Sequence, residues 1–238
     1  MSIRSNSYYH ALIYSFFMFS AVAATPCLFS IAAVAEREQE NDNYSNDTNE
    51  DFEVQNLIKI CCTWGHNLLD GILTYYTDTE SSTKRQQDEV RNAVQEWDRN
   101  IDPLKLEETF NEKDGDILIE FQEEYEGNGR EERAVGQSIN KFDNSSFIDK
   151  VQIIVYRGTS EYKFDEDMVQ RIVEHEMGHA LGLGHANFDG NLMAEKVNDG
   201  TENISECEVK AVLKANYWKL IADGSDPFMS EKNGIVCT

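Results

Sequence analysis

One short segment constrains this chain more than any other part of the sequence. Residues 175–185 read HEMGHALGLGH, which places His175 and His179 four residues apart. On an α-helix, side chains at this spacing lie one above the other on the same face. The two imidazoles can therefore bind one metal ion, and Glu176 lies beside that ion. The segment predicts a helix that carries part of a metal site.

A third ligand is expected just beyond the helix. Glycine adopts a positive φ without steric cost, so Gly182 can end the helix and turn the chain back toward the ion. His185 then completes a set of three, and three protein ligands on zinc leave a position open, which is typical of catalytic sites. At roughly 5% usage per residue type, such a match arises by chance on the order of once in 10⁴ chains. We therefore predict Zn²⁺ bound by His175, His179 and His185, with Glu176 as the catalytic residue that moves protons.

The same segment resembles the HExxHxxGxxH signature of the metzincin metallopeptidases, which continues to a methionine turn. Asn191-Leu192-Met193 supplies the methionine, eight residues past His185. The spacing is similar to that of the matrixins, and the resemblance extends over roughly residues 62–220. It implies a zincin (metzincin-like) fold, a polypeptide substrate, a catalytic domain over residues 61–238, and Met193 as a hydrophobic base beneath the metal.

The chain also departs from the matrixin pattern. Ala194-Glu195 follow Met193, without the proline and tyrosine that shape the specificity pocket in matrixins, so no side-chain preference is implied. With three histidines on the catalytic zinc, His66 alone cannot build a second zinc site. Asp143 and Asp149 are the candidates for a calcium site, although exposed, solvated carboxylates are the preferred interpretation.

Hydrophobic patterning predicts a single α/β (α+β) domain, in which a twisted mixed sheet packs on two long helices and a C-terminal helix follows. Runs rich in β-branched and aromatic residues predict strands at 71–77, 116–121, 134–141 and 147–156. Apolar residues at helical spacing predict the two long helices at 83–99 and 165–183. The last helix is expected to begin near Ser205, where Ser205 and Glu208 fit a capping box.

The N-terminal region predicts export. Residues 11–35 contain no charged side chain, and Ala33-Val34-Ala35 has the form of a signal peptidase site. The stretch is also long enough to stay in a membrane, with Arg4 holding its short end in the cytoplasm. Residues 1–35 are thus a signal peptide or a signal anchor, and the domain is secreted or membrane-anchored on the outside. The acidic residues 36–60 are expected to be a flexible linker or short propeptide.

The charge balance excludes one class of partner. The formal net charge is −23 at pH 7. Such a surface repels a phosphate backbone, so we expect no nucleic-acid partner. We expect a solvated surface on a monomer, with residues 11–35 as the possible membrane tether.

Four cysteines lie beyond the targeting segment: Cys61, Cys62, Cys207 and Cys237. An even number in an exported domain predicts two disulfides. Adjacent cysteines rarely bridge each other, so Cys61 and Cys62 are expected to pair with Cys207 and Cys237 in one order or the other. Free buried thiols are an alternative. In a third interpretation, Cys61 or Cys62 caps the zinc as a thiolate and holds the enzyme latent.

The predicted function is a zinc-dependent endopeptidase that hydrolyses peptide bonds through a metal-activated water. One alternative is a catalytically silent, zinc-binding, exported surface protein, but such a protein would not need Glu176. Another is a zincin of a different branch, such as an aminopeptidase, with a downstream glutamate as the third ligand. Glu206 and Glu208 are available, although His185 makes them unnecessary.

Overall fold

The computed structural model describes residues 55–123, 134–158, 163–197, 201, 203–220 and 234–237. The expected signal peptide or anchor, residues 1–35, lies outside these ranges, as do residues 36–54 of the expected linker. Among the helices that are described, none has the length and apolar character needed to cross a membrane.

The larger of two sheets has five strands in the order β3-β2-β4-β6-β5. These are β2 (Ile72–Thr77), β3 (Lys105–Glu108), β4 (Ile117–Gln122), β5 (Gly136–Phe142) and β6 (Ile148–Tyr156). Strands β2, β3, β4 and β6 are parallel, whereas β5 is antiparallel to β6 and forms one edge. The mixed sheet and its four predicted strands are confirmed. Within this sheet, only β3 was not predicted, because its sequence, KLEE, lacks the composition of a strand.

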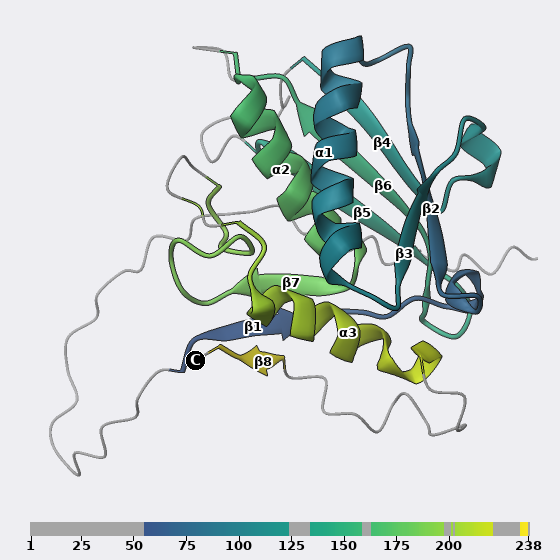
Figure 1. Ribbon diagram of the computed structural model, residues 1–238, viewed down its shortest axis with the longest axis vertical. Helices are drawn as coiled ribbons and strands as arrows, with labels where there is room; N and C mark the ends of the chain where they lie inside the picture. The colour runs from purple at the N-terminus through teal and green to yellow at the C-terminus, as the bar shows by residue number, and fades with distance from the viewer. Residues whose placement is uncertain are drawn as a thin grey trace, which may run out of the picture.

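Two long helices lie side by side on one face of this sheet, as predicted (Figure 1). They are α1 (Lys84–Asn100) and α2 (Glu166–Ala180), and short 3-10 turns occur at His66–Leu68 and Glu112–Asp114. Thr83 and Gln86 form a capping box at the start of α1. The apolar stripe of α1 ends at Trp97, whose indole N–H donates to the Glu174 carbonyl of α2 at 2.9 Å. This buried bond fixes the two helices against each other at the level of the histidine motif.

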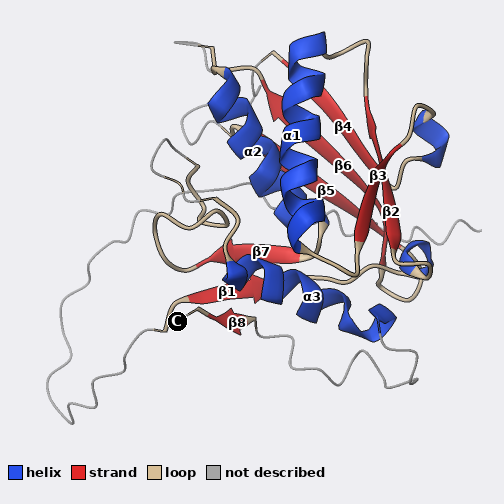
Figure 2. Ribbon diagram, in the orientation of Figure 1, coloured by secondary structure: helices blue, strands red, loops and turns tan. Residues whose placement is uncertain are grey.

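A second, smaller sheet closes the end of α2 (Figure 2). Its order is β7-β1-β8, with β1 at Leu57–Ile60, β7 at Leu183–Ala186 and β8 at Ile235–Val236. The C-terminal helix α3 (Glu206–Leu220) packs against it, and Ser205 N–H donates to the Glu208 carboxylate at 3.0 Å, as the predicted capping box requires. Strand β1 falls within residues 36–60, so for residues 57–60 the expectation of a flexible linker is wrong.

The predicted cysteine pairing is also wrong. Disulfides join Cys61 to Cys62 and Cys207 to Cys237. Strand β8 pairs with the start of β1, and Cys237 N–H donates to the Asn56 carbonyl at 2.8 Å. Cys61 follows Asn56 by five residues of extended chain, which places it roughly 16 Å from Asn56 and its partner Cys237, at about 3.3 Å per residue. That separation is well beyond the reach of a disulfide, about 7 Å between Cα atoms, so Cys237 bridges to α3 instead.

Candidate metal centre and active site

The structure brings the three predicted histidines together. His175 and His179 lie on the last turns of α2, and His185 follows on β7. Their ring centroids are 4.7, 4.9 and 5.6 Å apart, and one ring nitrogen from each lies within 4.8 Å of the other two. Within the described part of the chain, this is the one group of three or more potential ligands that could hold a metal ion.

Backbone carbonyls set the orientation of the two helical histidines. The Nδ1 atom of His175 bonds to the Leu192 carbonyl at 2.6 Å, and Nδ1 of His179 bonds to the Leu183 carbonyl at 2.9 Å. Because a carbonyl only accepts, each Nδ1 carries the proton, and each neutral ring has its lone pair on Nε2. The two Nε2 atoms lie 3.1 Å apart. Two facing lone pairs at this distance repel each other unless a cation lies between them.

His185 shows the same lack of a partner at its Nε2 atom. That atom is buried and has no hydrogen-bond partner in the structure. Buried polar atoms are nearly always satisfied, so an unpaired ring nitrogen in a histidine cluster fits a metal ligand. The donor set is three imidazoles, which suits zinc.

Burial keeps the three rings neutral. It lowers the pKa of His175 to about 4, an effect that the charge of His185 reinforces and the bond to the Leu192 carbonyl opposes. Burial also lowers the pKa of His179 well below its usual value, and the charges of His175 and His185 lower it further. The pKa of His185 is lowered as well, again chiefly by burial. Metal binding requires neutral imidazoles, so the cluster is ready to bind an ion at neutral pH.

Glu176 follows His175 on α2 and is 5% exposed. Burial raises the pKa of its carboxyl to about 8. The carboxyl fits against the edge strand β5 only because Gly136 has no side chain: a Cβ there would lie 2.6 Å from Oε1 of Glu176. A carboxyl whose pKa lies near neutral pH can both take up and release a proton, as a general acid-base catalyst must.

The turn after α2 follows the prediction for Gly182. Its φ is +101°, and its N–H donates to the His179 carbonyl at 3.0 Å. Its own carbonyl accepts the N–H of Cys61 at 2.9 Å and of Cys62 at 3.4 Å. A Cβ at Gly182 would lie 2.5 Å from the Cys62 carbonyl oxygen, so both the conformation and the close contact require glycine. This turn directs the chain into β7 and toward His185.

Met193 is fully buried and packs against α2, in the turn between His175 and His179. The contact is with Gly178, at which a Cβ would lie 2.3 Å from the Met193 sulfur. Sequence reasoning did not assign a role in the site to three groups that shape this region: Gly136, Asn191 and the Leu192 carbonyl. Two of them stand in the motif quoted for the methionine turn, but their bonds depend on neighbours distant in the chain.

The other candidate ligands lie elsewhere. Glu206 forms an ion pair with Lys210, and Glu208 is bonded to Asn191 and Ser205, so neither glutamate joins the histidine cluster. The Asp143 carboxylate accepts two backbone N–H groups of its own turn, from Ser145 at 2.8 Å and Phe147 at 3.0 Å. No calcium site is shown at Asp143 or at Asp149 in the described residues.

Comparison with known proteins agrees with this geometry. A search of curated proteins finds no match to the chain. The family model for matrixins matches residues 63–215, which is more than half of the chain. The match includes the five-stranded sheet, α1, α2, β7 and the histidine cluster, whereas β1 and β8 lie outside it. The chain belongs to the matrixin family of metallopeptidases.

Proposed function

We propose that this protein is a zinc-dependent endopeptidase. The observation that carries the proposal is the convergence of three neutral imidazoles, with Nε2 atoms of His175 and His179 only 3.1 Å apart. The same helix carries the buried Glu176, directly after His175. Ligand nitrogens about 2.0–2.1 Å from a tetrahedral zinc are roughly 3.3 Å from each other, so the spacing suits this ion.

His175, His179 and His185 would hold the zinc. When bound, zinc supplies a water of lowered pKa and polarises the peptide carbonyl. Glu176 takes the proton from the attacking water and later delivers it to the departing amine nitrogen. Such general acid-base catalysis typically contributes about 10² to 10⁴ in rate.

The edge strand β5 supports an extended polypeptide substrate. It pairs with β6 on one side, and its residue Gly136 contacts Glu176. An added strand can bind along such an edge through main-chain hydrogen bonds, which accept many side-chain sequences. This placement favours cleavage within a chain, with broad sequence tolerance, over removal of a terminal residue.

The domain is proposed to act outside the cell, secreted or tethered through residues 11–35. The uncharged N-terminal stretch supports export, and so does the disulfide between Cys207 and Cys237, because disulfides persist mainly in oxidising compartments. N-terminal sequencing of the mature protein would reveal whether the stretch is cleaved near Ala35.

Two matched variants test the function. Glu174 and Glu176 are both buried carboxyls of α2, each with a pKa raised chiefly by burial. The Glu174 carboxyl accepts from the Gln170 amide, whereas that of Glu176 lies against Gly136 of the edge strand. We expect zinc-loaded protein to cut casein, with Glu176→Gln slower by about 10² to 10⁴ and Glu174→Gln close to wild type. Both should retain zinc.

A silent zinc-binding protein would bind zinc in all three forms and cut nothing. An aminopeptidase would release single residues from the N-terminus of casein, visible by mass spectrometry, instead of internal fragments. Cleavage by Glu176→Gln at the wild-type rate would contradict the assignment of this residue.

A further inference from the structure

Among the described residues, the most deeply buried carboxylate is that of Glu208 in the first turn of α3, which is 0% exposed. Burying a charge is costly unless it is hydrogen-bonded. Both of its oxygens accept: Oε1 from the Asn191 amide, and Oε2 from the N–H of Ser205 at 3.0 Å and from the Ser205 hydroxyl. The first turn of α3 is therefore built around this carboxylate, which has a partner far away in the chain.

That partner, Asn191, uses both ends of its amide. Nδ2 donates to Glu208, and Oδ1 accepts the N–H of Met193 at 2.9 Å. Because a carboxylate only accepts, it fixes which end of the amide faces it and so directs Oδ1 toward Met193. Asn191 is 3% exposed, so water does not compete for either bond. Glu208 thus holds the turn at residues 191–194, which the bond from Ala194 N–H to the Asn191 carbonyl closes at 3.0 Å.

The same turn touches the metal centre. Its Leu192 carbonyl accepts a hydrogen bond from Nδ1–H of His175 at 2.6 Å, and this bond leaves the lone pair on Nε2. We propose that Glu208 is a positioning residue for His175, and that it acts through Asn191 and the Leu192 carbonyl. The inference rests on the proposed zinc site and adds a residue of α3 to its support. Outer partners of this kind orient a ligand ring and raise its basicity.

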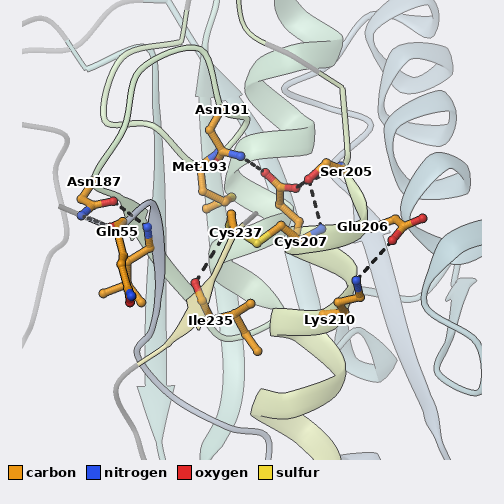
Figure 3. The surroundings of a disulfide bond; sticks show 12 residues. Gln55, Asn187, Asn191, Met193, Ser205, Glu206, Cys207, Lys210, Ile235 and Cys237 are labelled. Carbon is orange, nitrogen blue, oxygen red and sulfur yellow. Dashed lines mark hydrogen bonds and ion pairs between the residues drawn. A yellow bond between two sulfur atoms is a disulfide. The ribbon is translucent and has the colours of Figure 1, made fainter. Parts of the chain in front are cut away.

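The disulfide between Cys207 and Cys237 strengthens this arrangement. Cys207 precedes Glu208, and its N–H donates to the Ser205 hydroxyl at 3.1 Å. Figure 3 shows Asn191, Ser205 and the disulfide gathered around the start of α3. The bridge ties that turn of the helix to β8, on the far side of β1 from β7, which carries His185. The support of His175 is thus anchored covalently at its outer end.

Zinc affinity tests the proposal without relying on catalysis. The whole chain is titrated against a chromophoric chelator as wild type, Glu208→Ala, Asn191→Ala and the double variant. Loss of an outer-shell partner weakens metal binding by about 10- to 100-fold, which is the effect expected for each single variant. The two residues act through the same chain of contacts. The double variant should therefore bind zinc no more weakly than the single variant with the lower zinc affinity. The Co²⁺ absorption spectrum of each single variant should also shift, since it reports the ligand geometry.

Val212→Ala is the matched control. Val212 is also fully buried on α3, so this variant should lower the melting temperature while leaving zinc affinity unchanged. If Glu208→Ala does not fold, Asn191→Ala carries the test, because Glu208 then keeps its bonds to Ser205. Wild-type zinc affinity in the single variants, or losses that multiply in the double variant, would overturn the positioning role alone. A wild-type protein that binds no zinc would overturn the proposed function as well.

Discussion

Gly136 on the edge strand and Glu176 on α2 meet so closely that a Cβ on the glycine would lie 2.6 Å from Oε1 of the glutamate and 2.8 Å from its Cγ. The same Cβ would lie 2.7 Å from Cγ2 of Ile172. A Cβ atom does not make contacts this short, so any side chain at Gly136 must displace the carboxyl. The edge strand thereby determines where the proposed general base lies.

Gly136→Ala is expected to reduce casein cleavage by on the order of 10²-fold, the cost of misplacing a catalytic group by about 1 Å. Zinc content should remain at the wild-type level, because the histidines do not contact Gly136 in this way. Combining the substitution with Glu176→Gln should add little further loss, since both act on the same group. A fully active Gly136→Ala would show that the carboxyl position does not matter for the reaction.

Gly178→Ala is expected to destabilise the protein by about 1–3 kcal/mol, the usual cost of overpacking a core. The added methyl group would overlap the Met193 sulfur, 2.3 Å from the new Cβ. Urea denaturation measures the loss. Met193→Ala removes the clashing atom, so the double variant should lose less than the two single losses added together. Additive losses would indicate that the two residues do not press on each other.

The pH dependence of the metal-free protein reports on Glu176, whose pKa is raised from 4.5 to about 8. An acid with a raised folded-state pKa contributes stability that is complete below pH 4.5 and is lost as pH rises through 8. Glu176→Gln lacks this titration. As pH rises between these limits, its free energy of unfolding should therefore increase relative to that of wild type. The increase is on the order of a few kcal/mol, at about 1.4 kcal/mol per pKa unit.

The three histidines titrate in both proteins, so the difference between them isolates the carboxyl. Chemical denaturation in the presence of a chelator, repeated across the pH range, provides the measurement. A difference that stays constant from pH 4.5 to pH 8 would contradict the buried, proton-retaining state of Glu176.

The two disulfides are expected to differ in their effect on stability. Cys207 and Cys237 are 30 residues apart in sequence, whereas Cys61 and Cys62 are adjacent. In the loop-closure model, replacing the longer bridge with a Cys207→Ser/Cys237→Ser pair costs about 3–4 kcal/mol. A Cys61→Ser/Cys62→Ser pair removes no loop and should cost much less. Urea denaturation of the oxidised proteins compares them, and an equal or reversed order would be evidence against this reasoning.

The main elements of the fold were predictable because their signals are local. The stripe from Val90 to Trp97 gives α1, and runs such as residues 148–156 give buried strands. Strands β1, β7 and β8 were not predicted, because two to four residues carry too little periodicity. Such short strands exist only because neighbouring chain segments pair with them. The cysteine pairing was wrong for the same reason, because it depends on the pairing of the unpredicted strands β1 and β8.

The sequence by itself determined the candidate ligand set, since the spacing of His175 and His179 on a helix, the glycine at position 182 and His185 leave few other chemistries open. Tertiary structure decided how that set is held. The Leu192 carbonyl, the Glu208 carboxylate and the space left by Gly136 reach the site from the turn, from α3 and from the edge strand. Helical spacing is a property of consecutive residues, whereas a hydrogen bond or a close contact between distant segments exists only once the chain has packed.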